Sequence, residues 1–268
     1  MKIYRNVTKL KNIEMFYFDT KTSNPNETII CLHGLWGRAE TWYDFIKHYG
    51  KNYRIIAPDQ RGHGLSSKPD SMYTAEEMAE DVKDLIDFLN IKSAIIVGHS
   101  MGGGIAAYFT HLYPEYVKAL AILDKSSVHQ KEKVTADPIT KDWSMPFLSL
   151  DDARNTIRKA MESDFSYNYF LKSLMETVEG YKMMFDSNAI ALILSNFEDW
   201  SHLLPEIECL TLLIKSKGEG SVKNEDFLKM KSLIKNSMAF EMSHPDHNVM
   251  LANKEEFYGY FDKFLDSI

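Results

Sequence analysis

Short runs of apolar residues alternate along the chain with segments in which apolar residues recur every three or four positions. The runs are rich in β-branched side chains, which is typical of strands covered on both faces of a parallel sheet. They occupy residues 28–32, 53–57, 94–97, 117–124, 210–214 and 238–242. Helical spacing is found over residues 39–49, 75–89, 105–113, 224–234 and onward from 254. This alternation predicts an α/β protein with a parallel sheet wrapped by helices.

Two local patterns refine this prediction. Residues 13–18 alternate weakly and predict an antiparallel strand at the edge of the sheet. Thr74 precedes one predicted helix, with Glu77 three residues on, which is the spacing of a capping box. The buried face of that helix is predicted to carry Met78, Val82, Leu85, Ile86 and Leu89.

Residues 126–205 interrupt the alternation with a helical, aromatic pattern that contains no strand signal. We therefore expect a core domain formed by residues 1–125 and 206–268, with residues 126–205 inserted as a helical cap. A cap over the ends of the strands places the ligand between cap and sheet.

Composition narrows the class of protein. The chain has 268 residues, of which 44% are hydrophobic and 26% charged, as in ordinary soluble domains. The net charge is −7 and there is no basic block, so we expect neither a nucleic-acid nor a membrane partner. No stretch has the length of a signal peptide core or a membrane span. We expect a cytoplasmic monomer or homodimer that acts on a small molecule.

Cofactor and metal sites are not indicated either. The two cysteines, Cys31 and Cys209, lie in or beside apolar runs, which favours buried thiols in a reducing compartment. The sequence contains no metal-ligand cluster and no glycine-rich phosphate loop after a strand. We therefore expect no metal and no cofactor.

Ser100 lies within Gly98-His99-Ser100-Met101-Gly102, between a predicted buried strand and a predicted helix. Glycines on both sides permit a sharp turn that exposes the serine hydroxyl, and the helix aims its N-terminal amides at the same place. This pattern predicts a catalytic nucleophile. The alternative is a glycine-rich turn with an incidental serine.

Several motifs, taken with that serine turn, resemble those of the α/β-hydrolase superfamily over essentially the whole chain. They are residues 33–37, 59–66, 98–103, 113–115 and 247–257, in the family's order and spacing. The resemblance implies a mostly parallel, eight-stranded sheet with helices on both faces and an inserted helical cap. It also implies roles for individual residues.

Ser100 would attack a carbonyl carbon, and it needs an adjacent base because a free hydroxyl is a weak nucleophile. His247, after the last strand, stands at the family's histidine loop, and nearby His244 is an alternative. The backbone N–H groups of Leu35 and Met101 would form the oxyanion hole.

Three further side chains belong to the same motifs. His33 and His99 are expected to hold backbone turns together. Trp36 is expected either to line the substrate pocket or to pack on its own loop, and His33 is a second candidate for the pocket.

The acid of the triad is left open between two residues. Counting from the strand at 210–214 places Glu219 where the family usually has an aspartate. Asp124, at the end of the strand before the cap, is the alternative, because some relatives supply the acid from there. We expect Glu219 by a small margin.

The cap is rich in aromatic residues and methionine, and no paired arginines are present to clamp an anion. We therefore expect a carboxylic-ester hydrolase that forms an acyl-enzyme on a small, largely apolar substrate. A lactonase, a carbon–carbon bond hydrolase or a perhydrolase with the same triad is the alternative. A fold that binds a ligand without turnover is an alternative of another class.

Overall fold

A computed structural model describes residues 1–129 and 133–268 of the chain. The eight-stranded sheet has the order β1-β2-β4-β3-β5-β6-β9-β10. The strands are β1 (Tyr4–Lys9), β2 (Glu14–Asp19), β3 (Thr28–Leu32), β4 (Arg54–Pro58), β5 (Ala94–His99), β6 (Val117–Leu123), β9 (Leu210–Lys215) and β10 (Ser237–Glu241). The strands β4, β3, β5, β6, β9 and β10 of this sheet are parallel to one another. The predicted fold class is therefore confirmed.

The antiparallel edge differs in detail from the prediction. Strand β2 pairs antiparallel with both β1 and β4, so it is not the edge strand. The edge is β1, whose residues are mostly exposed. Its sequence, YRNVTK, buries too little apolar surface to give a strand signal.

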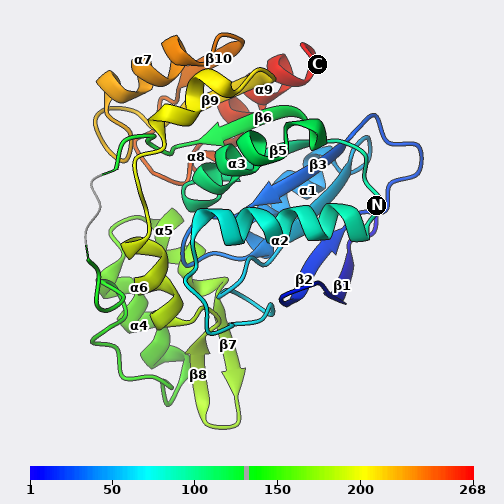
Figure 1. The fold of residues 1–268 in the computed structure, drawn as a ribbon. Coiled ribbons are helices and arrows are strands. Elements are labelled where there is room, and N and C mark those ends of the chain that lie inside the picture. The colour runs from blue at the N-terminus through cyan, green and yellow to red at the C-terminus, as the bar shows by residue number, and fades with distance from the viewer. Residues whose placement is uncertain (130–132) are drawn as a thin grey trace.

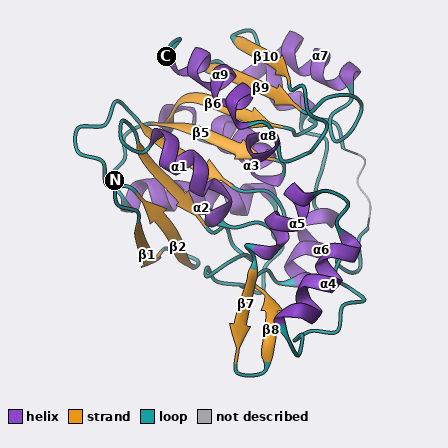
Figure 2. Cartoon of the chain, turned by 180° about the vertical axis from the view of Figure 1, so that it is seen from behind, coloured by secondary structure: helices purple, strands orange, loops and turns teal. Residues whose placement is uncertain are grey.

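Helices cover both faces of the sheet, because successive residues of each parallel strand point to opposite sides. Ile30 and Ile96 pack in one core with α2 (Ala75–Phe88) and α3 (Met101–Leu112). Their neighbours Ile29 and Ile95 pack in a second core. That core contains residues of α1 (Tyr43–Tyr49), α8 (Val249–Ala252) and α9 (Lys254–Leu265). Figure 1 shows α2 and α3 in front of the sheet, and Figure 2 shows α1 and α9 on the opposite side.

The segment between β6 and β9 lies beside one end of the sheet (Figure 1). It contains the helices α4 (Leu150–Ala160), α5 (Asp164–Leu171) and α6 (Ser187–Ser195) and the 3-10 helix η3 (Ser201–Glu206). A hairpin of β7 (Leu174–Thr177) and β8 (Gly180–Met183) projects from it. The expectation of a purely helical insertion was therefore wrong. Two four-residue strands are too short for their alternation to be recognised in the sequence.

Beyond the cap, α7 (Asn224–Leu233) connects β9 to β10. Met230 of this helix belongs to the same core as α2 and α3. Two 3-10 helices, η1 (Ala39–Trp42) and η2 (Pro114–Tyr116), complete the regular elements of the described chain.

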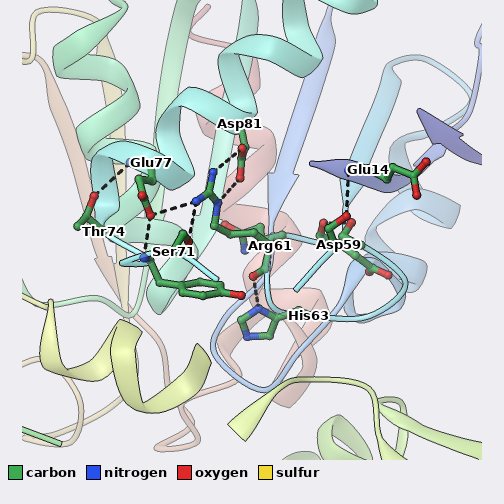
Figure 3. A network of polar contacts seen from close by, with 12 residues as sticks. Glu14, Asp59, Arg61, His63, Ser71, Thr74, Glu77 and Asp81 are labelled. Carbon is green, nitrogen blue, oxygen red and sulfur yellow. Dashed lines mark hydrogen bonds and ion pairs between the residues drawn. The ribbon is translucent and has the colours of Figure 1, made fainter. Parts of the chain in front are cut away.

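The loop after β4 is held by buried charges (Figure 3). The guanidinium of Arg61 donates to Asp81 of α2 through Nε (2.6 Å) and Nη2 (2.8 Å), and through Nη1 to Glu77 (3.0 Å) and Ser71 (3.1 Å). Arg61 and Asp81 are almost fully buried, and a buried pair is destabilising to break because the remaining charge has no partner. The loop of the 59–66 motif is thus fixed to α2.

Candidate active site

Ser100 occupies a strained turn between β5 and α3. Its φ of 52° and ψ of −119° are rare for a residue with a side chain. A Cβ added to Gly98 would lie 2.6 Å from Gly103 N, and one added to Gly102 would lie 2.7 Å from His33 O. Both contacts are too short for any side chain, so the two glycines are required by the close approach of the backbone. The predicted turn is confirmed.

His247 lies on the loop between β10 and α8. Its Nδ1 is 2.6 Å from Asp124 Oδ2, and Ser221 Oγ is 2.8 Å from the same nitrogen. His247 and Ser100 line one cavity. His244 is placed differently: its Nδ1 accepts a hydrogen bond from the Asp246 backbone N–H, at 3.1 Å.

Asp124, and not Glu219, lies against the histidine. Asp124 is 1% exposed at the end of β6, and its Oδ1 accepts a hydrogen bond from the Ser216 backbone N–H at 2.6 Å. Burial acts to raise the pKa of Asp124, but the hydrogen bond and charge of His247 and the Ser216 N–H outweigh it, so the pKa is lowered. Glu219 is exposed and accepts from the Asn224 N–H (3.0 Å) at the start of α7. Glu219 therefore makes a helix-capping contact.

His99 supports the loop that carries His247. Its Nε2 is 2.9 Å from the carbonyl oxygen of His247, which makes Nε2 the protonated nitrogen. Burial and the charge of His247 lower the pKa of His99 to about 3, so the ring is neutral. This contact agrees with the expected turn-holding role.

His33 is fully buried between two backbone groups. Its Nδ1 is 2.9 Å from Gly34 O, and its Nε2 accepts from the Gln60 N–H at 3.0 Å. Burial and the neighbouring His63 lower the pKa of His33 well below its usual value. With both nitrogens used, His33 holds turns together. It is not among the residues that line the cavity at Ser100, so its candidacy for the substrate pocket is withdrawn.

Leu35 lines the same cavity as Ser100, and Met101 is the first residue of α3. The N–H groups of a first helical turn have no partner within the helix. Within the described chain, neither the Leu35 nor the Met101 N–H donates to a backbone or side-chain acceptor. Both are thus available to an oxyanion.

Trp36 contacts both the cavity and the cap. It lines the cavity, and its ring packs against Phe170 of α5 with centroids 5.7 Å apart. Its Nε1 donates to the carboxylate of Asp137, at 3.2 and 3.3 Å.

The cavity at Ser100 has a volume of about 150 Å³. The inserted segment supplies its largely apolar roof, which includes Ile139, Met161, Tyr169 and Phe170. A second, wider cavity borders Ser100 and His247 on the side of Asp124 and Ser221. A space for ligand thus lies between cap and sheet, as expected.

Sequence reasoning missed two polar neighbours of this site. Ser221, whose hydroxyl contacts His247, is a serine in a polar loop and carries no distinguishing sequence signal. Lys125 follows the buried Asp124 directly and lines the second cavity. A charged residue at the carboxyl end of a buried strand is a signal that would have identified it.

Other expectations concern metals, thiols and membranes. In residues 1–129 and 133–268, no cluster of three or more His, Cys, Asp or Glu side chains is arranged to hold a metal ion. Cys31 and Cys209 are both free thiols. No helix in these residues has the length and apolar character needed to cross a bilayer.

The chain is similar in sequence or fold to several known proteins. An uncharacterized protein of Mycobacterium tuberculosis is 34% identical over 119 residues, 44% of this chain, and the match spans about a third (32%) of that protein. Human serine hydrolase BPHL is 26% identical over 260 residues, covering 91% of this chain and 81% of the relative. The crystal structure of E-2-(acetamidomethylene)succinate hydrolase superposes with a TM-score of 0.85 at 20% identity, covering 99% of this chain and 100% of that one.

The family described as the alpha/beta hydrolase fold matches residues 27–253. That range includes the serine turn, Asp124, the cap and His247. The chain therefore belongs to the α/β-hydrolase fold family.

Proposed function

We propose that this protein is a serine hydrolase that cleaves a carboxylic ester through an acyl-enzyme. The observation that carries the proposal is that Ser100, on its strained turn, shares a cavity with His247, whose Nδ1 lies 2.6 Å from the buried carboxylate of Asp124. A serine, an imidazole and an orienting carboxylate are the parts that nucleophilic acyl transfer needs.

The roles of the side chains follow from their contacts. Asp124 accepts a hydrogen bond from the Nδ1–H group of His247. The Nε2 atom is then free to take the proton of Ser100 Oγ as that oxygen attacks the carbonyl carbon. The N–H groups of Leu35 and Met101 stabilise the negative oxygen of the tetrahedral intermediate. His247 then gives its proton to the departing alcohol, and a water molecule hydrolyses the acyl-enzyme by the same steps.

Asp124 is preferred to Glu219 as the acid of the triad. Glu219 is exposed and bound to the start of α7, whereas Asp124 is buried and in contact with His247. An exposed glutamate in place of the family's usual aspartate would favour a fold that binds a ligand without turnover. With Asp124 as the acid, the loop around Glu219 has no bearing on whether the triad is complete.

The size of the cavity supports a small acyl group. It holds about 150 Å³ and is lined by Leu35, Met161 and Phe170 among others. Burial of each additional methylene against such a wall contributes about 0.8 kcal/mol until the space is filled.

A panel of p-nitrophenyl esters with acyl chains of two to twelve carbons tests the proposal. We expect kcat/KM to rise through the short chains and to fall for long ones. Ser100→Ala should lower kcat by about 10⁴-fold or more while leaving the protein folded. Equal turnover by Ser100→Ala and the wild type, or no turnover of any ester, would refute it.

A further inference from the structure

A third cavity, of about 160 Å³, lies between α2, α3 and the end of α6. Met101 lines it, immediately after the nucleophile, and so does Gly104, one helical turn along α3. Lys125 lines this cavity and also the wider cavity that borders Ser100 and His247. Lys125 is thus the side chain common to the two spaces.

The ammonium group of Lys125 has an unusual set of neighbours. Its Nζ lies 4.1 Å from the centre of the Phe197 ring, and no carboxylate of a described residue is within ion-pair distance of it. Asp226, whose negative charge acts on Lys125, already accepts hydrogen bonds from the Ser127 N–H (3.0 Å) and Ser127 Oγ (2.8 Å). Burial lowers the pKa of Lys125 to about 8, and Asp226 only partly opposes this.

A second donor without an acceptor lies beside the lysine. Trp200 is 2% exposed, and its Nε1 has no hydrogen-bond partner among the described residues. A Cβ built on Gly104 would lie 3.5 Å from Lys125 Cε and 3.8 Å from Trp200 Nε1, so the end of the lysine stem and the indole N–H both lie close to this point on α3. A buried donor without an acceptor is destabilising, and so is a half-buried cation without a counter-charge in contact. The chemical group that would satisfy both donors is an acceptor, most favourably an anionic one.

Other charges in this cavity limit where an anion fits. Glu76 and Glu198 also line it, and together with burial they raise the pKa of Tyr108. Tyr108 lies one helical turn beyond Gly104 on α3. The negative charges thus act on the Tyr108 end of the cavity, and Lys125 borders the wider cavity beside Ser100 as well.

We propose that Lys125 and Trp200 form a carboxylate subsite, so that the preferred substrate is an ester with an anionic group one helical turn from its reacting carbonyl. This inference rests on the proposed ester hydrolysis and adds a substrate class to it. A carboxylate is favoured over a phosphate, because two donors, of which only one is charged, satisfy one negative charge and not two.

The distance from Ser100 to Gly104 along α3 determines which ester is a suitable test substrate. Gly104 is four residues after Ser100, a rise of about 6 Å along the helix. Monomethyl glutarate carries its carboxylate at about this distance from the ester carbonyl, and methyl pentanoate is its uncharged counterpart. Acid release from each ester, titrated at constant pH 7, gives the ratio of the two kcat/KM values.

We expect wild type to favour monomethyl glutarate by about tenfold or more. Lys125→Met keeps the aliphatic stem but removes the charge, and it should abolish this preference by raising the KM for monomethyl glutarate. Trp200→Phe should reduce the preference by a smaller factor. Lys118→Met is the matched control, because it removes a lysine at the other end of β6, paired with Glu27 on the surface, and it should leave the preference intact.

The outcomes separate the two proposals. Cleavage of both esters with a ratio that Lys125→Met does not change would overturn the subsite and leave the esterase proposal standing. Cleavage of neither would count against the esterase, and the subsite is then decided by calorimetric binding of monomethyl glutarate to Ser100→Ala. A Kd that rises about tenfold on adding Lys125→Met supports the subsite, and an unchanged Kd or no binding overturns it.

Discussion

The side chain of Asp124, at the end of the sheet, contacts the loop that carries His247. Its position at the end of β6 puts it beside the carboxyl end of β9, where the Ser216 N–H binds one carboxylate oxygen while His247 binds the other. Because the carboxylate is buried and doubly bound, it fixes the orientation of the imidazole. The Asp124 carboxylate is thus held at the end of the sheet by the first residue after β9, and not by the exposed part of the loop that follows.

Asp124→Asn keeps the shape of this side chain but removes its charge and offers an N–H to His247. We expect kcat to fall by about 10³- to 10⁴-fold, because the amide favours the wrong tautomer of the imidazole. Glu219→Gln should change kcat by less than about threefold, since Glu219 contacts only the start of α7. Steady-state kinetics on a short-chain ester decides between the two acids. A full loss in Glu219→Gln would contradict the assignment.

The sequence could not make this choice. Counting along the chain locates Glu219 relative to its own strand, but β6 and β9 become neighbours only when the sheet forms. The distance from a strand end to a histidine more than a hundred residues later is a property of the tertiary fold. Ser100 and His247, in contrast, are marked by local glycines and by the closing helix, so their motifs predicted the places where the structure has them.

At the scale of elements, the turn between β5 and α3 depends on close approach of three backbone segments. Gly98 faces the first turn of α3, and Gly102 faces the end of β3 and the residue after it. A Cβ added to Gly104, in the same helix, would make contacts of ordinary van der Waals length. These glycines therefore differ in what they tolerate.

Gly98→Ala and Gly102→Ala should each destabilise the protein by about 3 kcal/mol or more, because the added methyl group meets backbone that cannot move aside. Gly104→Ala should raise the free energy of unfolding by about 0.5–1 kcal/mol, because alanine is the better helix former. Urea unfolding of the three variants measures this. Equal changes in the free energy of unfolding at all three positions would show that backbone contacts do not require glycine at Gly98 and Gly102.

Elements with strong apolar periodicity were predictable, and weakly apolar ones were not. All six parallel strands and α2 follow from apolar runs or an apolar face. Strand β1 is largely exposed and the β7–β8 hairpin is mostly half-buried, and the structure of these short segments depends on pairing with a partner strand. Pairing of that kind leaves little signal in the sequence.

At the scale of the whole molecule, buried neutral histidines make the free energy of unfolding depend on pH. Burial lowers the pKa of His63 to about 4 and that of His99 to about 3, and it also lowers the pKa of His33. The unfolded chain binds these protons near pH 6.5. The histidines therefore contribute full stability above pH 6.5, and this contribution is lost as the pH falls toward the folded pKa values.

The expected loss is about 2 kcal/mol at pH 5 for each of His63 and His99. His63→Asn keeps a donor for the Arg61 carbonyl but cannot be protonated, so its stability should fall by about 2 kcal/mol less than that of wild type between pH 7 and pH 5. Urea unfolding at the two pH values gives the comparison. An identical pH dependence in both proteins would show that His63 does not titrate with unfolding.

The central claim is that Ser100 is an activated nucleophile, and labelling by a fluorophosphonate tests it most directly. The intact mass of the wild-type protein should increase by one adduct, while Ser100→Ala gains none and Glu219→Gln is labelled as fast as wild type. Asp124→Asn should be labelled far more slowly. Absence of an adduct on the folded wild-type protein, or an equal adduct on Ser100→Ala, would contradict the account.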